Sequence, residues 1–532
     1  MRRAFFASLA ASALAYATLN CTGTDPDIES TPTNDASSSD GNVVDPTNDG
    51  GGSDGGGGDG NDGAPPTPEG AFSWSFLAGP PQTGAVPVAV DGAGNVIFAV
   101  RFNGANAAFG DKTLSSTARD VAVVRLSPNG KTVDWAVLIT GPGNEEVTGI
   151  TIDANDDVYV SGTFDGATMS ASGTPSVNRG TLAVANAFVA KLSGATGAGQ
   201  WVTPFTITAP DGGSSLGATG GPLRATAGGL WFACNFRGDI VLPSGTATLP
   251  DRNGTLLAKI DPSNGAVMPG WQTISSFNQG SNTLPAIEAV FTNAIEADPS
   301  GNLYVSGQQN ATQLRVGPSP INNAFRKGNS SGFVLGFGPS LASFPQWWKI
   351  FGPSSGATGA AAVRAMKLDA TRKAVYVTGT FSGESDFGYG NVKANDAGPA
   401  NDVFVVRITS DVGTPEWQKT FGGESGDMAA AIDVDPWGRP FVSAYFQNVG
   451  TALIDGKPLP SGSVFAAVKL DPADGKALYV TARSSTDTVT AYGAAGAPNG
   501  HAIMSGSLFG TMTFEAPKSL DGGAIFIADL TP

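Results

Sequence analysis

The sequence is dominated by one hydrophobic run that recurs seven times, and this recurrence limits the chain to a repetitive β architecture. Each run is rich in Val, Ile, Phe and Tyr and usually ends in a small residue. The runs begin, roughly 60–75 residues apart, at Asn95, Asp157, Gly229, Asn302, Ala374, Arg439 and His501. A near-constant spacing of this length, built from short β-like segments, is typical of radial or solenoidal repeat folds.

Each repeat contains four strand-like segments. The first precedes a turn rich in Asp, Asn and Gly, and such turns are typical of tight antiparallel hairpins. The second is the recurring run, and the third usually ends in a basic residue followed by Leu or Ile. The fourth segments begin at Trp135, Trp201, Trp271, Trp348, Trp417 and, in the sixth repeat, Leu478. Because no long stretch has a helical apolar period, the sequence predicts an all-β fold.

The seventh repeat ends at Pro532, directly after its third segment, and so lacks a fourth one. A separate segment at Trp74 precedes the first repeat, and we expect it to supply the missing strand. The sequence therefore predicts a single seven-bladed β-propeller over residues 71–532, with four-stranded antiparallel blades and a ring closed by an N-terminal strand. The third and fourth repeats depart most from the pattern, so their blades are expected to be the least regular.

The repeat resembles the SBBP-type repeat of bacterial seven-bladed β-propellers. The resemblance rests on three motifs. The first is a D-x-x-G-N turn followed by a run of one hydrophobic residue, Tyr or Phe, and then V-x-G. The others are F-V-x-K/R-L in the third segment and W-x-x-x-x-G-G in the fourth, and residues 417–423 match the last closely. It covers about residues 71–532 and is specific for the fold. The resemblance implies an exported or cell-surface protein, and it implies little chemistry because most members of that family have no assigned function.

The N-terminus has the features of an export signal. Arg2 and Arg3 precede a short apolar stretch, and Cys21 follows it in a position that resembles the lipidation cysteine of bacterial lipoproteins. Secretion after cleavage at Ala17 and a twin-arginine signal are the alternatives. The apolar stretch is too short to span a bilayer. We expect residues 1–21 to be a signal peptide with a lipidated Cys21, and the protein to be an outer-membrane lipoprotein or cell-surface protein, or else periplasmic or secreted.

Residues 22–70 are predicted to be a disordered acidic linker. They contain eleven acids, no Lys or Arg, and many Gly, Asp and Pro residues. Such a composition cannot bury enough apolar surface to fold. The net charge of −16 is therefore partly local, since residues 71–532 hold 35 acids and 28 bases. A mildly acidic body argues against nucleic acid as a partner, and against a membrane except through a lipid anchor.

Cofactor and metal chemistry have little support in the sequence. Cys21 and Cys234 are the only cysteines and His501 is the only histidine, which excludes ordinary zinc, haem and iron–sulfur sites and a disulfide framework. We therefore expect no cofactor and no metal. An acidic turn at residues 153–157, with Asp153 and Asp157 at its ends, leaves calcium binding open, although hairpin geometry alone explains such turns. Cys234 lies in an apolar run and is expected to be a buried small hydrophobic residue.

Candidate catalytic motifs are weak. Residues 213–217 and 352–356 match the nucleophile-elbow pattern G-x-S-x-G, but neither is followed by a helical pattern, which the motif requires. His501 is expected to be a half-exposed turn residue, and a role as the base of a lyase is the alternative. We therefore predict no catalytic residue and no enzyme.

Long connections between the second and third segments distinguish the repeats from one another. In a propeller these connections emerge on one face, and binding residues concentrate on loops that a rigid scaffold carries. Phe109, Phe387 and Phe514 are predicted to anchor these inserts by packing. We expect the ligand on this long-loop face, around the mouth of the central channel. The predicted function is an exported, monomeric binding or scaffold module for an unknown extracellular protein or glycan. The alternative is a propeller-type lyase or glycan-active enzyme that uses carboxylates of the loop face.

Overall fold

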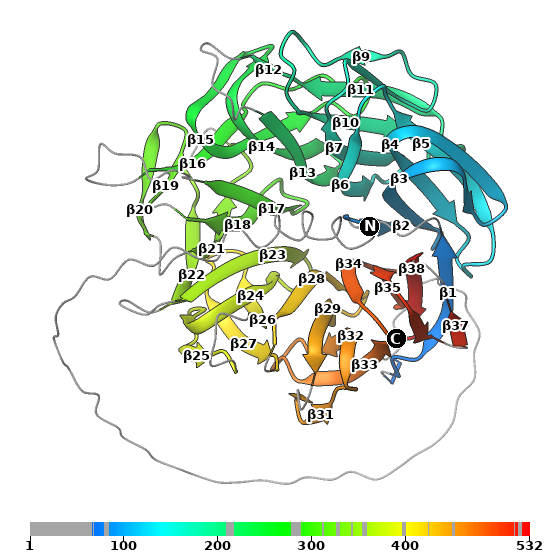
Figure 1. The fold of residues 1–532 in the computed structure, drawn as a ribbon. Helices are drawn as coiled ribbons and strands as arrows, with labels where there is room; N and C mark the ends of the chain where they lie inside the picture. Colours follow the sequence, from blue (N-terminus) through cyan, green and yellow to red (C-terminus); the bar gives the residue numbers. More distant parts are fainter. Residues whose placement is uncertain are drawn as a thin grey trace, which may run out of the picture. The chain divides into compact units, whose positions relative to one another are not determined.

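The computed structural model describes residues 66–67, 69–78, 84–208, 217–277, 289–310, 313–325, 330–341, 344–353, 359–395, 401–423, 425–449, 453–514, 517–519 and 524–532. All regular structure in these residues is β-strand, within one compact unit, Pro66–Pro532 (Figure 1). The described residues include no helix that is long and apolar enough to cross a membrane. The predicted all-β class is confirmed.

Four antiparallel strands recur seven times. The first strands are β2 (Val88–Val90), β6 (Glu145–Ile152), β13 (Gly217–Thr226), β17 (Val290–Ala297), β23 (Gly359–Asp369), β28 (Asp427–Val434) and β34 (Val489–Gly496). The second strands are β3 (Val96–Phe109), β7 (Val158–Phe164), β14 (Gly229–Leu242), β18 (Leu303–Gln309), β24 (Ala374–Asp386), β29 (Pro440–Val449) and β35 (Ala502–Leu508). Each second strand pairs with the first strand of its repeat.

The third and fourth strands complete each repeat. The third strands are β4 (Lys112–Leu126), β10 (Asn186–Leu192), β15 (Gly245–Ile260), β21 (Ser331–Phe337), β26 (Asp402–Thr409), β32 (Gly462–Leu470) and β38 (Ala524–Leu530). The fourth strands are β5 (Val133–Thr140), β11 (Gly199–Phe205), β16 (Gln272–Phe277), β22 (Trp347–Pro353), β27 (Pro415–Phe421), β33 (Ala477–Ser485) and, for the seventh repeat, β1 (Phe72–Ala78). The predicted pairing of the Trp74 segment with the last strand is confirmed, because β1 pairs with β38 along its length.

The sheets are not uniformly four-stranded, so the prediction of four-stranded blades is confirmed only in part. Three sheets have four strands, and others have six, seven or nine. The additional strands are β8 (Thr168–Ala171), β9 (Val177–Asn178), β12 (Ile207–Thr208), β19 (Gln313–Val316), β20 (Ser319–Phe325), β25 (Asn391–Lys393), β30 (Leu453–Ile454), β31 (Lys457–Pro458), β36 (Thr511–Thr513) and β37 (Pro517–Ser519). Several of them join one repeat to the next.

The inserts between second and third strands reach the outer edge of the neighbouring repeat. β8 of the second repeat pairs with β5, and β19 of the fourth repeat pairs with β16. The end of β24 likewise pairs with β22. These strands cover a sheet edge that would otherwise expose unpaired backbone groups. The inserts were expected around the channel mouth, and these three lie at the periphery instead.

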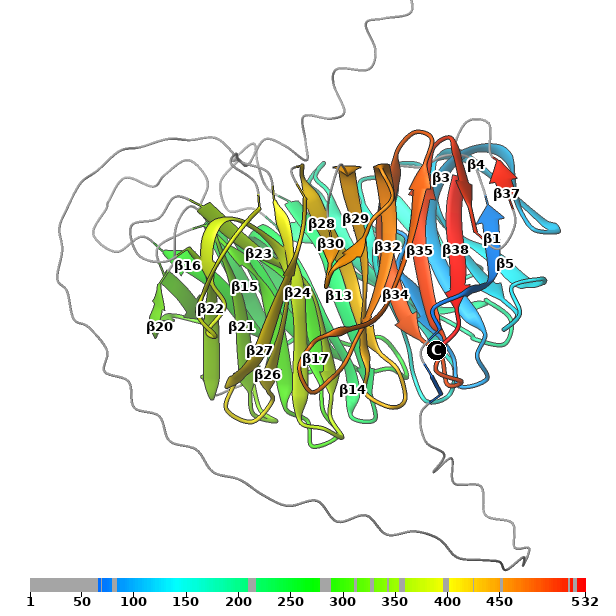
Figure 2. The same cartoon turned by 90° about the horizontal axis from the view of Figure 1, so that it is seen from below.

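The hydrophobic core is divided among the junctions between repeats. Buried residues of the described chain form seven clusters, and each cluster joins two neighbouring repeats. One of them joins the seventh repeat to the first, through Ile503 and Ile525 on one side and Phe98 and Val124 on the other. The first strands also contact one another in the order β2, β6, β13, β17, β23, β28, β34 and back to β2. They lie nearest the middle of the unit, and the sheets stand side by side around them, which is the arrangement of a β-propeller (Figures 1 and 2).

An aromatic residue of the fourth strand packs under a glycine turn of the next repeat. Trp135 lies against Gly197, which has a φ of 71°, and its indole Nε1 donates a hydrogen bond to the Gly194 carbonyl at 2.8 Å. A side chain on Gly197 would meet the ring at 2.8 Å, so the turn needs glycine for both space and conformation. The same contact joins Trp74 to Gly130, Trp201 to Gly265, Trp347 to Gly413, Trp417 to Gly475 and Tyr479 to Gly70.

This contact corrects two sequence assignments. In the fourth repeat the packing residue is Trp347 instead of Trp348, and in the sixth repeat it is Tyr479 instead of Leu478. Tyr479 pairs across the sheet with Lys469, as Trp417 does with Arg407. The third repeat departs from the pattern, as expected, because Trp271 donates to Ser244 of its own repeat.

Residues 66, 67, 69 and 70 belong to the folded unit, although the linker was predicted to extend to residue 70. The Pro66 carbonyl accepts a hydrogen bond from Arg439 at 2.9 Å, and the Glu69 amide donates to the Pro532 carbonyl at 2.7 Å. Thr481 donates to the Gly70 carbonyl. This short segment therefore runs beside the sixth repeat before β1 begins.

Candidate functional site

A β-bulge interrupts the first strand of six repeats at an equivalent position. In each case the register against the second strand shifts by at least one residue. The residues skipped by the pairing are Thr148, Gly221 with Pro222, Asn293, Arg364, Ala430 and Tyr492. Bulges re-aim a side chain and are frequent beside active sites. The bulges therefore repeat one specialised position around the middle of the fold.

Small residues in the second strands let the bulged strands approach closely. Ser161 of β7 donates a hydrogen bond to the Gly221 carbonyl at 2.6 Å, and Ser505 of β35 donates to the Val86 carbonyl at 2.5 Å. Both serines are fully buried. The small residue that recurs near the end of each hydrophobic run thus lies where the next repeat packs against the second strand.

Four bulge residues line one cavity of about 300 Å³. They are Asn293, Arg364, Ala430 and Tyr492, from four successive first strands, and Tyr445 of β29 joins them. The cavity lies toward the beginnings of β28 and β34, at the face from which the long connections emerge. It is therefore on the face predicted for the ligand, but strand residues line it, whereas loop residues were expected there.

Arg364 is the only charged residue among the described residues that line this cavity. Its side chain is exposed to solvent, yet desolvation by the surrounding protein lowers the pKa of its guanidinium. Both observations are explained if the side chain extends into a water-filled recess that is enclosed by protein. Tyr445 is its electrostatic neighbour, and burial raises the pKa of the Tyr445 hydroxyl.

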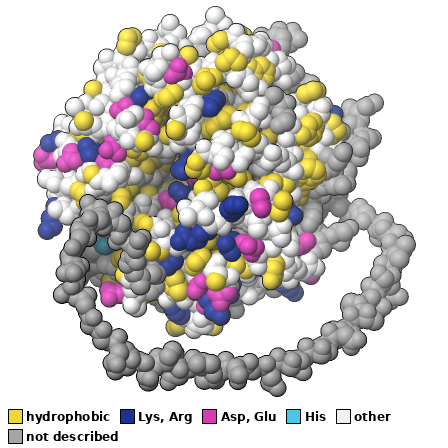
Figure 3. All heavy atoms as spheres, turned by 180° about the vertical axis from the view of Figure 1, so that it is seen from behind, with side chains coloured by type: hydrophobic (Ala, Val, Ile, Leu, Met, Phe, Trp, Pro, Cys, Tyr) yellow, Lys and Arg dark blue, Asp and Glu magenta, His cyan; other side chains and the backbone are white. Residues whose placement is uncertain are grey.

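The other bases near the middle of the fold are paired with acids of the next repeat. Arg101 lies 2.6 Å from Glu146, and Lys367 lies 2.6 Å from Asp433. Arg224 lies 3.2 Å from Glu296, whose pKa burial raises even though the arginine opposes the shift. Among the described residues, Arg364 has no such carboxylate partner. Basic and acidic side chains accordingly lie next to one another on the face drawn in Figure 3.

A second cavity, of about 320 Å³, lies at the opposite face among the turns between first and second strands. Two carboxylates line it, Asp91 and Asp435. Asp91 is paired with Arg125 at 2.9 Å, and Asp435 with Lys469 at 2.8 Å. These acids hold the turns against the third strands, which leaves them no free charge for a ligand.

His501 lies in the turn that begins β35. Its Nδ1 is 2.7 Å from Asp529, and its side chain is 24% exposed. Asp529 occupies the third-strand position that Arg125 and Lys469 occupy in other repeats, so the seventh repeat has an acid where those repeats have a base. Ser73 also donates a hydrogen bond to Asp529. His501 is therefore explained as a turn residue, at some distance along the strand from the cavity-lining bulge.

The acidic turn at residues 153–157 is held by hydrogen bonds of its own hairpin. Asp153 accepts from the amides of Asn155 and Asp157 and from the Tyr159 hydroxyl. Asp157 is paired with Lys191 at 2.9 Å. These contacts use the carboxylates for turn geometry, and the described residues contain no group of three or more potential ligands arranged to hold a metal.

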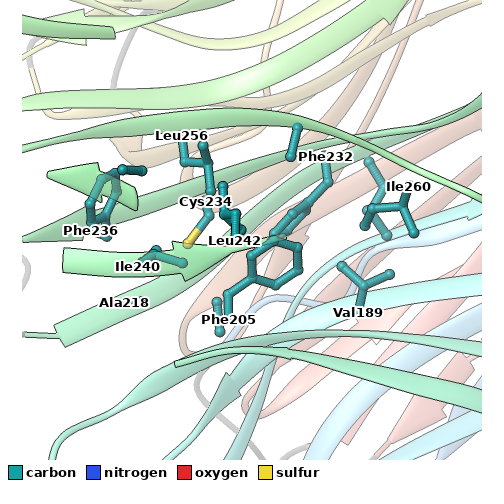
Figure 4. Packing of buried hydrophobic residues seen from close by; sticks show 14 of the residues in the cluster. Val189, Phe205, Ala218, Phe232, Cys234, Phe236, Ile240, Leu242, Leu256 and Ile260 are labelled. Atoms are coloured by element: carbon teal, nitrogen blue, oxygen red, sulfur yellow. The ribbon is translucent and has the colours of Figure 1, made fainter. Parts of the chain in front are cut away.

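The remaining sequence candidates are apolar or fall outside the described residues. Cys234 is buried among Phe232, Phe236 and Leu256, as predicted, and burial raises the pKa of its thiol (Figure 4). The predicted anchors are also buried, and they are Phe109, Phe387 and Phe514. Cys21 lies outside the described residues, as do the central residues of both G-x-S-x-G stretches.

The bulge residues were missed because no local pattern marks them. Each sits inside a strand of alternating residues and is recognisable only when the register against the second strand is known. The sequence held an indirect signal for these residues. If the first segments are aligned on the Asp of the following turn, Asn293 and Arg364 lie at similar distances along the chain from that Asp.

Comparisons with known proteins leave the family open. No family model and no curated protein matches the sequence. Three of the similar solved structures are a quinohemoprotein alcohol dehydrogenase from Comamonas testosteroni, a protein of unknown function from Dyadobacter fermentans and a PL25 ulvan lyase bound to -[GlcA(1-4)Rha3S]-. Their identities are 10%, 12% and 8%, with TM-scores of 0.40, 0.36 and 0.40. They cover 86%, 87% and 86% of this chain, and this chain covers 76%, 97% and 94% of theirs.

Proposed function

We propose that residues 71–532 form a single seven-bladed propeller, with four core strands in each blade and β1 as the closing strand. The strongest support is that the junction between the seventh and first repeats has the same parts as the others. It has its own buried cluster, and Trp74 donates to the Pro128 carbonyl at 3.1 Å, as Trp135 does to Gly194. The resemblance to SBBP-type repeats remains part of this proposal.

The propeller acts as an exported binding or scaffold module, with its ligand at the mouth of the central channel. The observation that carries this function is the convergence of four bulge residues from four repeats on one cavity. A packing role does not require a bulge at the equivalent position of six repeats, nor a different side chain at each bulge. Varied residues on a repeated, rigid position are what a recognition surface needs. The partner is an extracellular glycan or protein, and the chain is expected to be a monomer.

A cavity-filling variant tests the location of this site. The full chain is screened on a glycan and protein array beside Ala430→Trp, in which the indole would occupy the cavity, and Ser172→Ala, a control in an insert turn. We expect Ala430→Trp to lose the ligands that the wild type and the control bind. Binding that Ala430→Trp retains in full would place the ligand elsewhere on the molecule.

The enzyme alternative has less support. A lyase or glycan-active enzyme on this face needs an acid or base beside the substrate. The described lining of the cavity holds no carboxylate, and His501 is engaged with Asp529 in a turn. We therefore propose binding without catalysis.

We further propose that Cys21 is lipidated and that residues 22–65 form the stalk that carries the propeller. The support is the order of charged, apolar and cysteine residues at the N-terminus. Expression of Cys21→Ser should move the protein from the membrane to the soluble fraction. Cys234→Ala, which changes the only other cysteine, should leave it in the membrane fraction. A Cys21→Ser protein that stays with the membrane would contradict lipidation.

A further inference from the structure

We infer that the part of the glycan or protein ligand that enters the channel cavity is a small unit with one carboxylate, which Arg364 binds. This inference rests on the proposed function and adds the chemical class of the ligand. Its first support is the charge of the bases on the first strands. The first strands carry three described bases, and two of them, Arg224 and Lys367, lie against carboxylates of the neighbouring repeat. Arg364 lies on the same strand as Lys367 and has no acid in reach among the described residues.

The position of Arg364 is set by the backbone around it. It is the bulge residue of β23, and the preceding carbonyl, of Val363, accepts a hydrogen bond from Asn293 Nδ2 at 2.7 Å. This bond ties the bulge to the fourth repeat, so the stem of Arg364 starts from a fixed point at the cavity wall. A guanidinium in a protein stays protonated and offers planar, paired donors that match a carboxylate.

The side chain of Arg364 reaches solvent, but the protein around it removes part of its hydration, and no described acid offsets that cost. Desolvation already disfavours its charged form. The residues that line the cavity supply no negative charge to balance Arg364, because the other polar ones are neutral: Asn293, Tyr445, Thr490 and Tyr492. A bound anion would supply the missing charge, and hydrogen bonds to charged groups are the stronger ones.

The size and surroundings of the cavity narrow the class of anion. A volume of about 300 Å³ is at the lower limit for ligand pockets and suits one sugar unit or a similar molecule. Two tyrosines line the cavity with an aromatic ring and a polar hydroxyl each, which suits a ligand that is partly apolar and partly hydroxylated. Residues 71–532 hold 35 acids and 28 bases, and this excess of negative charge disfavours polyanions and favours a ligand with a single charge.

The test compares acids with their neutral counterparts by calorimetry on the full chain. The probe pairs are glucuronate with glucose, and benzoate with benzyl alcohol, so that sugar and aromatic bodies are distinguished. The variants are Arg364→Gln, Arg364→Lys and Lys131→Gln; the last removes the same charge from an exposed turn. Thermal unfolding of each variant verifies that it is folded.

We expect the wild type and Lys131→Gln to bind at least one acid about tenfold or more tightly than its neutral counterpart. Arg364→Gln should abolish that preference, and Arg364→Lys should retain part of it. Equal binding of acid and neutral probes that Ala430→Trp abolishes would overturn the carboxylate inference and leave the channel site intact. Acid binding that survives both Arg364→Gln and Ala430→Trp would overturn both. Failure of every carboxylate, in calorimetry and on the glycan array, overturns the inference as well.

Discussion

Glu145 is a carboxylic acid buried next to a second acid. It begins β6, is fully buried, and lies near Asp120 of β4, which is 2% exposed. Burial, followed by the hydrogen bond and charge of Asp120, raises the pKa of Glu145 to about 8. Asp165 adds to the shift, and a backbone hydrogen bond at Gly141 opposes it. At neutral pH Glu145 therefore keeps its proton, at the junction of the first and second repeats.

This proton makes stability depend on pH in a defined direction. In the unfolded chain Glu145 loses its proton near its ordinary pKa of 4.5, whereas the folded protein retains it to about 8. Between these values the folded state binds more protons, so its contribution to stability is lost as the pH rises. We expect the free energy of unfolding to fall by up to about 1.4 kcal/mol per pH unit from this group.

Chemical denaturation of the wild type and Glu145→Gln at intervals from pH 4 to 9 measures this contribution. The variant should lose this part of the pH dependence and be the more stable protein at pH 9. In Asp120→Asn the fall should end at a lower pH and be smaller, because burial still raises the pKa of Glu145 but the contribution of Asp120 is gone. Identical slopes in wild type and Glu145→Gln would show that Glu145 ionises normally.

At the scale of elements, the turn between third and fourth strands is the joint between repeats. In five repeats a glycine of this turn, with positive φ, covers the ring of an aromatic residue from the preceding fourth strand, and in the seventh repeat Gly70, just before β1, does so. Gly130, with a φ of 66°, covers Trp74 and so performs this task where the two ends of the chain meet. Gly173 has a φ of 89°, but a β-carbon added to it would have no neighbouring atom within 4 Å, which makes it a matched control.

Gly130→Ala and Gly173→Ala separate the backbone effect from the packing effect. Both substitutions force alanine into a left-handed conformation, at a cost of about 1–2 kcal/mol. Only Gly130→Ala also pushes a methyl group into the Trp74 ring. We expect it to lower the free energy of unfolding by about 1–3 kcal/mol more than the control does. Equal losses in urea denaturation would mean that the turn does not pack on Trp74.

At the scale of the whole molecule, stability is shared among junctions, each of which needs both of its repeats. The core clusters lie between sheets, so a repeat cannot bury its apolar residues alone. β1 contributes Phe72 to the cluster between the sixth and seventh repeats and Ala78 to the cluster between the seventh and first. This one strand therefore takes part in two junctions.

Deletion of residues 71–78 should destabilise the entire folded unit. Loss of the strand exposes the edge of β38 and removes buried aromatic area, which we expect to cost several kcal/mol, on the order of one or two large core side chains. Thermal unfolding and hydrogen exchange should both show weaker protection in β38 and in the first repeat. Deletion of residues 22–65 serves as the control and should leave the melting temperature unchanged. A melting curve unaffected by loss of residues 71–78 would contradict closure by β1.

The sequence by itself determined the number of repeats, the order of strands within them and the strand that completes the last one. These features are local: runs of alternating or continuous apolar residues form strands, and Asp, Asn and Gly at fixed places form the turns between them. Asp91, Asp298 and Asp435 indeed accept hydrogen bonds from the amides of their own turns. The burial of Cys234 followed from its apolar neighbours in the same way.

Only the tertiary structure decided which side chains line the cavity. A shift of one residue turns a strand's side chains to the opposite face, and the shift is set by pairing between strands that are distant from any local signal. For this reason Trp347 and Tyr479, not Trp348 and Leu478, cover the glycine turns. For the same reason Arg364 appears in the sequence as one base among several. It becomes distinct because it is a bulge residue that lines the cavity and has no carboxylate partner among the described residues, whereas Lys367 on the same strand is paired with Asp433.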